Sequence, residues 1–156
     1  MSLVLPSKFM ELVYFSALGS GDNGGHSSGN AKSMAADNVN VWTIPAGTLI
    51  ENVYMILTAA ITGTTNLDFG DDDDADGYID SSLSVTLNTP GVYGANAKLA
   101  GAYLRVETAG VTDAADIYVV PQVKYYAAAG KEIKMDLTGV GTAGSFILVI
   151  EGSRLA

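Results

Sequence analysis

The side chains with the greatest potential for chemistry lie in one acidic stretch, Asn66 to Asp80, which reads NLDFGDDDDADGYID. Leu67 and Phe69 alternate with polar residues before Gly70, and this alternation predicts a half-buried strand that ends there. Five aspartates follow within six residues: Asp71, Asp72, Asp73, Asp74 and Asp76. Because like charges at this spacing repel one another, we expect the loop to lie in water, to bind a cation or to face a basic partner.

Nine residues of this stretch are arranged as in a calcium-binding EF-hand loop. Counted from Asp72, aspartates occupy positions one, three, five and nine, glycine occupies position six and isoleucine position eight. Leu83 stands at position twelve, where an EF-hand has a bidentate glutamate, and the flanks are predicted strands instead of helices. We expect no required cofactor. Calcium is the candidate ion, with Asp72, Asp74, Asp76, Asp80 and the Tyr78 carbonyl as ligands, and the alternative is a solvated turn.

Catalytic motifs are absent from the sequence. His26 is the single histidine, and it lies in the Gly- and Ser-rich segment Gly19 to Ser33, where an ordered general base is not expected. The chain has no cysteine and no GxSxG, P-loop or HExxH motif. Adjacent aspartates on a solvated turn do not supply the apolar pocket that glycoside hydrolysis by paired carboxylates requires. We therefore expect a protein that is not an enzyme.

Aromatic side chains offer an alternative function, the binding of a carbohydrate or a receptor. Such a face could be built from Trp42, Tyr54, Tyr78, Tyr93, Tyr103, Tyr118, Tyr125 and Tyr126. Tyrosine is also a common residue at core edges and subunit interfaces. Because these residues are scattered along the chain, they do not indicate a single platform, and the carbohydrate- or receptor-binding module stays the second hypothesis.

The elements around these residues read as short strands. We predict strands over residues 10–16, 39–44, 49–58, 65–69, 83–88, 117–120, 122–127, 131–137 and 144–151. Turn signals separate several of them, at Pro45-Ala46-Gly47, Thr62-Gly63-Thr64 and Thr89-Pro90-Gly91. The only helical signal is a weak one over residues 95–104. The pattern predicts an all-β fold, an antiparallel, jelly-roll-like β-sandwich of about eight or nine strands.

Two of these strands carry finer predictions. Residues 10–16 are apolar on both faces, so we expect this strand to be covered on both sides. Residues 144–151 are also apolar on both faces, and we expect this strand to be central in its sheet.

A length of 156 residues predicts one domain. We expect residues 1–38 to form an N-terminal arm, the first strand and a Gly/Ser-rich loop, packed on the same domain, and residues 39–156 to form the β-sandwich. The start MSLVLPSKF lacks the features of a secretory signal, and no apolar run approaches the roughly 20 residues of a membrane helix. We therefore expect a soluble, unprocessed chain.

Charge is sparse and mostly negative. Eight basic and seventeen acidic residues give a net charge of −9 and an isoelectric point near 4.2. This balance argues against partners that are nucleic acids or anionic membranes, since both require clustered lysine and arginine. An apolar share of 48% and a mean hydropathy of +0.25 indicate more apolar surface than a small lone domain buries, which favours assembly into oligomers.

Two longer segments show a familiar order of elements. They read WTIPAGTLIENVYMILTAAITGTTNLDFGDDDDADGYID and KYYAAAGKEIKMDLTGVGTAGSFILVIEGSRL, within Val39 to Asp80 and Lys124 to Leu155. The first is a strand, an I-P-A-G-T turn, a long strand, a T-G turn and a strand that ends in a G-D-rich loop. The second has the Y-Y-A-A and T-A-G signals before a final strand. Together they resemble small virion structural proteins of tailed bacteriophages, of the head decoration type.

The resemblance implies a structural, non-catalytic function. It implies a β-sandwich that decorates or cements a capsid as a homotrimer, bound to the major capsid protein on the virion surface after synthesis in the host cytoplasm. It brings no catalytic residues with it. We expect the arm Met1 to Lys8 and the Gly-rich loop to make the contacts with a partner.

Overall fold

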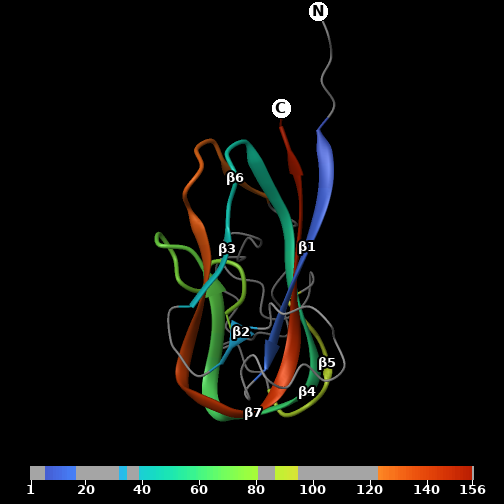
Figure 1. Ribbon diagram of the computed structural model, residues 1–156, viewed down its shortest axis with the longest axis vertical. Coiled ribbons are helices and arrows are strands. Elements are labelled where there is room, and N and C mark those ends of the chain that lie inside the picture. The colour runs from blue at the N-terminus through green and yellow to red at the C-terminus, as the bar shows by residue number, and fades with distance from the viewer. Residues whose placement is uncertain (1–5, 17–31, 35–38, 81–86, 95–122, 156) are drawn as a thin grey trace, which may run out of the picture.

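Seven strands and no helix are present in the part of the chain that this computed structural model describes, residues 6–16, 32–34, 39–80, 87–94 and 123–155 (Figure 1). They are β1 (Ser7–Ser16), β2 (Lys32–Ser33), β3 (Val39–Thr43), β4 (Thr48–Gly70), β5 (Gly91–Tyr93), β6 (Lys124–Tyr126) and β7 (Glu132–Arg154). Within those residues, accordingly, no helix is long and apolar enough to cross a membrane.

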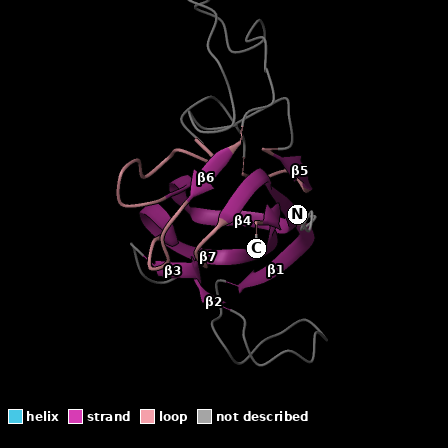
Figure 2. Ribbon diagram, turned by 90° about the horizontal axis from the view of Figure 1, so that it is seen from above, coloured by secondary structure: helices cyan, strands magenta, loops and turns pink. Residues whose placement is uncertain are grey.

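A long antiparallel ribbon of β4 and β7 organises the fold. Each strand has 23 residues, and they pair from Thr48 opposite Arg154 to Gly70 opposite Lys134. The ribbon is bent near its middle, so that its two halves face each other as two layers (Figure 1). The bend lies at the lower end of the molecule in that view, and the strands enclose the interior when seen from above (Figure 2).

The shorter strands widen each layer. In the first layer the order is β2-β1-β7-β4-β5, with β6 on the first residues of β4, and β1 pairs with β7 from Ser7 opposite Arg154 to Ser16 opposite Ser145. In the second layer β3 pairs with the first residues of β7, and Ile79 forms a bridge to Phe69 of β4. All these pairings are antiparallel except that of β1 with β2. The predicted all-β fold and antiparallel β-sandwich are confirmed.

The predicted turn at Thr62-Gly63-Thr64 is wrong, because β4 continues through these residues. Register shifts between Leu57 and Asn66 bend the ribbon instead of reversing it. Gly63 has a φ of +90°, a left-handed conformation that favours glycine. The Thr-Gly signal therefore marks an unusual backbone conformation, but the chain does not reverse its direction there. As a result, the predicted strands 49–58 and 65–69 are one strand, and so are 131–137 and 144–151.

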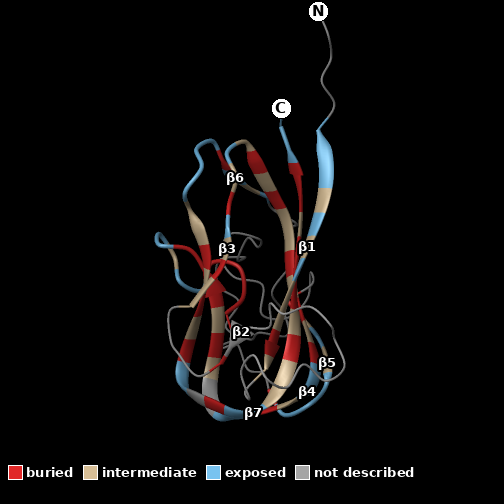
Figure 3. Cartoon of the chain, in the orientation of Figure 1, coloured by how far each residue is buried: buried red, intermediate tan, exposed pale blue. Residues whose placement is uncertain are grey.

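The core fills the space between the two layers. Phe15 of β1 stacks on Phe146 of β7 with a centroid distance of 4.5 Å. Both rings also make edge-to-face contacts with Phe69 of the second layer, with centroid distances of 6.1 Å from Phe15 and 5.8 Å from Phe146. Along β4 and β7, buried residues that face the core alternate over much of their length with less buried residues that face outward (Figure 3). This cluster ties the two halves of the bent ribbon together.

The strand β1 differs from its prediction. Met10 and Leu12 are 57% and 47% exposed, so the expectation that both faces of this strand are covered is wrong. The reason is its position: β1 packs on the core through Phe15, while its alternate residues point out of the sandwich. The prediction that 144–151 is central is confirmed, because this part of β7 lies between β1 and β4.

Some predictions lie partly or wholly outside the described residues. Strand 117–120, most of 83–88, the weak helical signal at 95–104 and nearly all of Gly19 to Ser33 are in this group. Leu87 and Asn88 form a turn, and β5 begins at Gly91, the last residue of the predicted Thr89-Pro90-Gly91 turn signal. The jelly-roll-like strand order and the division into residues 1–38 and 39–156 stay predictions.

Candidate functional site

The acidic loop, Asp71 to Asp80, follows β4 directly and is closed at its base by backbone hydrogen bonds. The Phe69 amide donates to the Ile79 carbonyl at 2.9 Å, and the Phe69 carbonyl accepts from the Tyr78 amide at 2.8 Å and the Ile79 amide at 3.0 Å. Within the loop, the Asp71 amide donates to the Asp74 carbonyl at 2.9 Å. The loop therefore has a defined backbone, although its sequence is one of strongly repelling charges.

Asp71 is the buried aspartate at the start of this loop, with only 3% of its surface exposed. Its Oδ1 accepts hydrogen bonds from the amides of Asp73 at 2.9 Å and Asp74 at 3.2 Å, the pattern by which aspartate closes a tight turn. Its Oδ2 accepts from the hydroxyl of Tyr126, on β6, at 2.6 Å. One carboxylate thus organises its own loop and links it to a strand more than fifty residues away.

Two buried tyrosines complete this arrangement. The hydroxyls of Tyr126 and Tyr78 share a hydrogen bond, so Asp71, Tyr126 and Tyr78 form a buried chain of three polar groups, the Asp71–Tyr126–Tyr78 chain. Burial raises the pKa of both phenols above the ordinary value for tyrosine, and the nearby Asp71 carboxylate adds to the increase. Both hydroxyls therefore keep their protons at neutral pH, as donors and acceptors that hold the loop in place.

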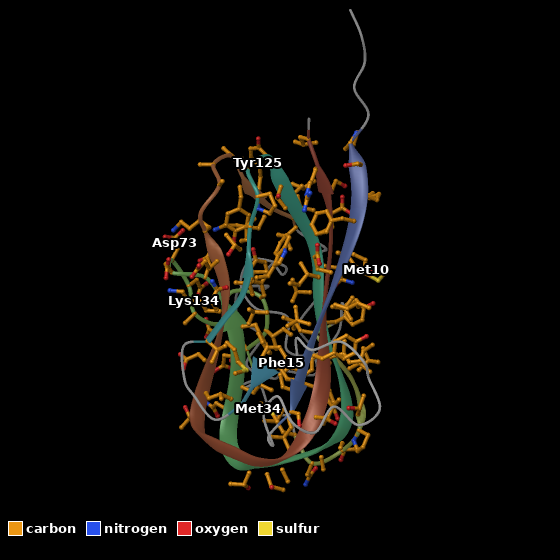
Figure 4. The ribbon with its side chains drawn as sticks, in the orientation of Figure 1. Met10, Phe15, Met34, Asp73, Tyr125 and Lys134 are labelled. Atoms are coloured by element: carbon orange, nitrogen blue, oxygen red, sulfur yellow. The ribbon has the colours of Figure 1, made fainter. Side chains whose placement is uncertain are left out.

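Lysines on β7 and just before it neutralise the exposed aspartates. Lys131 donates to Asp73 at 2.7 Å, and Lys134 forms an ion pair with Asp72. These carboxylates raise the pKa of both lysines, chiefly through the hydrogen bonds, so the ammonium groups stay charged. Figure 4 shows Asp73 and Lys134 on the same side of the molecule, at the beginning of β7. The sequence-based choice between water, a cation and a basic partner is thus answered in part by the chain's own lysines.

A hollow of about 220 Å³ lies between the loop and β7. It is lined by Asp71, Asp72, Asp73, Asp74, Ala75, Lys134 and Asp136. Small-molecule sites are mostly apolar with a few placed polar groups, and this lining has the opposite character. The arrangement is suited to holding a loop, and it lacks the apolar walls of a substrate pocket.

The predicted calcium ligands are placed differently from an EF-hand. Asp72 and Asp76 are exposed, Asp80 is 8% exposed, and the Tyr78 side chain is in the core. Among the described residues, no three aspartate, glutamate, histidine or cysteine side chains are grouped so that they could hold a metal ion together. Leu83, at the twelfth position, lies outside those residues. Calcium binding by Asp72, Asp74, Asp76, Asp80 and the Tyr78 carbonyl stays a prediction.

The aromatic residues of the alternative hypothesis are divided between the core and the surface. Tyr78 and Tyr126 are buried, and Trp42 packs beside Phe9 with a centroid distance of 5.5 Å. Tyr125 is 51% exposed. Tyr103 and Tyr118 lie outside the described residues, and His26 does too.

Sequence reasoning missed the functions of Asp71, Tyr126 and the two lysines. An aspartate immediately after a strand-ending glycine is a signal for a side-chain-closed turn, and it could have separated Asp71 from its neighbours. The lysine contacts could not be found this way, because they depend on the register that places Lys134 opposite Gly70.

Comparisons with known proteins give a likeness of fold. No family model matches the chain, and no curated protein matches it either. A chain of the cyanophage Pam1 capsid asymmetric unit is similar with a TM-score of 0.49 and 14% identity, over 96% of this chain and 86% of that chain. A chain from the acid-stable capsid structure of Helicobacter pylori bacteriophage KHP30 is similar with a TM-score of 0.50 and 11% identity, over 97% and 92%. At 11% identity, the likeness to the chain from the KHP30 capsid structure is one of fold alone.

Proposed function

We propose that this protein is a non-catalytic structural component of a bacteriophage virion that acts through contacts with neighbouring subunits. The observation that carries the proposal is the likeness to the chain from the phage KHP30 capsid structure, which extends over 97% of this chain and 92% of that one. The likeness concerns the fold, and its extension to a virion function is our inference.

The finer form of the proposal is a capsid decoration or cementing protein. In this function the protein would sit on the capsid surface, bind the major capsid protein and form a homotrimer, after synthesis in the host cytoplasm. Supporting this, apolar side chains stay exposed on the first layer, with Met10 at 57%, Leu12 at 47% and Val92 at 58%. Surface of this kind is common where proteins contact one another.

The candidate site supports a structural function in a second way. The Asp71–Tyr126–Tyr78 chain is directed into the fold, and its phenols hold their protons because burial raises their pKa. Groups in this state stabilise a loop and are poorly suited to act as a base or nucleophile at neutral pH.

The test is to look for the protein in particles. Virions from the source that encodes the chain are purified, their proteins are identified by mass spectrometry, and antibody against the purified protein is used for immunogold labelling. We expect a stoichiometric virion component on the capsid surface, and purified protein that binds capsids with a trimeric mass by light scattering. Its absence from particles would contradict the proposal.

A glycan array distinguishes the alternative function, a carbohydrate- or receptor-binding module, from the decoration function. A carbohydrate- or receptor-binding module would bind defined glycans and could do so as a monomer, whereas a decoration protein would bind none and would associate with capsids. The array is read together with the mass measurement, because a monomer that binds glycans would favour the alternative.

A further inference from the structure

The two outer faces of the sandwich differ in chemistry. On the second layer, strand register places Asn40 beside Lys134 and Asp68 beside Asp136, and residues paired in this way share one face of the sheet. Glu132 continues the same row of outward residues along β7. The outer face of the second layer is therefore polar and charged, as is usual for the solvent side of a β-sandwich.

The outer face of the first layer, here called the apolar face, has the opposite character. Where side chains are described, every large apolar residue that is exposed belongs to a strand of the first layer or directly flanks one: Met10, Leu12, Val92, Val123, Tyr125 and Leu155. Figure 4 shows Met10 and Asp73 on opposite sides of the molecule. Exposed apolar residues gathered on one side mark a surface that contacts another molecule.

The apolar face is continuous across the strands. Register aligns two rows of outward side chains, Leu12–Val149–Tyr54 across β1, β7 and β4, and Tyr14–Ile147–Ile56–Val92 across β1, β7, β4 and β5. Val149 is only 1% exposed, although its neighbours Leu148 and Ile150 are the ones that point into the core. The middle of this face is thus packed and apolar, and charge is confined to a neighbouring row.

That neighbouring row holds a carboxylate without a cation. Glu151 lies between Met10 and Asn52 in the register, and it accepts hydrogen bonds from the Asn52 amide at 3.1 Å and the Tyr54 hydroxyl at 3.4 Å. Both donors are neutral. Within the described part of the chain Glu151 has no ion pair, whereas Glu51, like Asp72 and Asp73, is paired with a lysine. The Glu151 carboxylate is therefore oriented at the apolar face with its charge uncompensated.

This combination restricts the occupant of the face. A second copy would bring another net charge of −9, and an anionic lipid surface would be repelled in the same way. A protein surface that carries an arginine or lysine among apolar residues is complementary, because its apolar part covers the two rows and its cation approaches Glu151. Apolar centres with arginine are common in protein interfaces, and charge complementarity selects the partner.

We propose that the apolar face is the docking surface for a protein partner with an arginine or lysine in an apolar surface, and that this cation pairs with Glu151. The inference rests on the proposed function and names the surface involved. In the decoration form of that function, the first layer faces the capsid, and the second layer with the acidic loop faces the solvent.

Cysteine labelling tests which face is covered, because the chain has no cysteine of its own. Val92→Cys places a thiol on the apolar face, where Val92 is 58% exposed, and Thr43→Cys places one on the exposed outer side of β3 in the second layer. The probe is capsids of the encoding phage prepared without this protein. We expect a maleimide to label both variants when they are free, and capsid binding to protect Val92→Cys while Thr43→Cys stays reactive.

Matched glutamine variants test the charge at the centre of the proposal. Glu151 and Glu132 each accept a hydrogen bond from an asparagine of a neighbouring strand, but they lie on opposite outer faces. Glu151→Gln should weaken binding to these capsids by about tenfold or more in co-sedimentation, and its binding should depend less on salt than that of the unchanged protein. Glu132→Gln makes the same change in net charge and should bind as the unchanged protein does. Far-UV circular dichroism verifies that both variants are folded.

The outcomes separate this inference from the proposed function. Capsid binding that protects Thr43→Cys, or that leaves both thiols reactive, would overturn the docking face and leave a virion function intact. Equal binding of the two glutamine variants would overturn the pairing of a cation with Glu151. Protection of Val92→Cys in concentrated protein without capsids would assign the face to a second copy, against the proposal. A protein that neither binds capsids nor occurs in virions would contradict the proposed function, and this inference with it.

Discussion

Asp71 is buried, whereas the next two aspartates in the sequence, Asp72 and Asp73, are exposed. Asp71 accepts hydrogen bonds from two amides and from Tyr126, whereas Asp72 and Asp73 are paired with lysines. The difference arises because Asp71 is the first residue after β4, where the chain turns inward. At the residue scale, the loop is held by one buried carboxylate.

Removal of a single hydroxyl tests this interpretation. Tyr126→Phe keeps the ring in the core but removes the donor to Asp71 and the partner of Tyr78. We expect a loss of about 2–3 kcal/mol in the free energy of unfolding, because a hydrogen bond to a charged, buried group is lost. Urea denaturation measures it. Tyr125→Phe is the control, since Tyr125 is exposed and a change within about 0.5 kcal/mol is expected. Equal effects of the two would contradict the interpretation.

The two buried phenols also predict a dependence of stability on alkaline pH. Their pKa values are raised in the folded protein, so above the unfolded pKa of about 10 the unfolded state binds fewer protons than the folded state. Their contribution is complete below that pH and is lost as the pH rises toward the folded values, by about 1.4 kcal/mol per pH unit for each group. Thermal melts from neutral to alkaline pH measure the slope, and Tyr126→Phe should reduce it.

Calcium binding is tested by melts with Ca²⁺ and with EDTA. Binding to the predicted ligands would raise the midpoint, by an amount equivalent to about 2.7 kcal/mol at one hundred times the dissociation constant. Because Lys134 is paired with Asp72, an ion that uses Asp72 must displace the lysine, and Lys134→Ala should show the larger increase. No shift in either protein would contradict the calcium prediction.

At the scale of the elements, the bend in the β4–β7 ribbon is the feature with the strictest requirements. Gly144 has a φ of +107°, and a Cβ added there would lie 2.5 Å from the Ala60 carbonyl oxygen and 2.7 Å from the Ile61 Cα. Both neighbours are backbone atoms of the facing strand, so they cannot move aside without changing the bend. A side chain at this position is excluded by conformation and by space together.

A pair of alanine substitutions separates these two contributions. Gly130 has a similar φ of +102°, but nothing lies within 4 Å of its added Cβ. Gly130→Ala should therefore cost only the conformational term, about 1 kcal/mol, whereas Gly144→Ala should cost about 3 kcal/mol or more. Urea denaturation of both variants measures the difference. Similar losses at the two positions would show that crowding at the bend contributes little.

Much of the secondary structure could be predicted from the sequence, and the connections between strands could not. Alternation of polar and apolar residues locates the second half of β4 and the first half of β7, where inward and outward positions differ in polarity, whereas β1 and the second half of β7 are located by short apolar runs. The Thr-Gly signal at residues 62–63 predicts a turn where the strand has register shifts, because bulges and turns use the same residue types. Exposure of Met10 could not be foreseen, since an apolar residue reads the same at an interface as in a core.

The candidate site shows the same division. The acidic loop itself was evident from its composition, but its lysine partners come from β7 and the chain just before it, about sixty residues later. Contacts of this kind follow from strand register, which depends on the whole sheet and not on any local window.

At the scale of the whole molecule, the negative charge opposes the proposed assembly, while exposed apolar side chains such as Met10, Leu12 and Val92 favour it. Each copy carries a net charge of −9, so two copies repel at long range. On β1, the Lys8 ammonium is paired with Glu51, and Glu11 adds a further negative charge between Met10 and Leu12. Charge therefore sets a barrier to the approach of two copies.

Salt should therefore strengthen self-association. Raising the ionic strength from about 0.01 M to 0.1 M shortens the screening length from about 30 Å to about 10 Å, and repulsion between copies falls while the apolar contact is preserved. Sedimentation velocity at the two salt concentrations should show a larger associated fraction at the higher one. An interface held together by ion pairs would respond in the opposite direction.

The pairing of Ser7 with Arg154 has a practical consequence, because it sets the start of β1 and the end of β7 side by side at one end of the sandwich (Figure 1). A short linker could span that gap, so a circularly permuted chain can keep every strand pair intact. The natural place to open such a chain is the exposed segment Ala127 to Gly130, which no strand uses. For the same reason, cargo fused at either end would project from the same pole of the molecule.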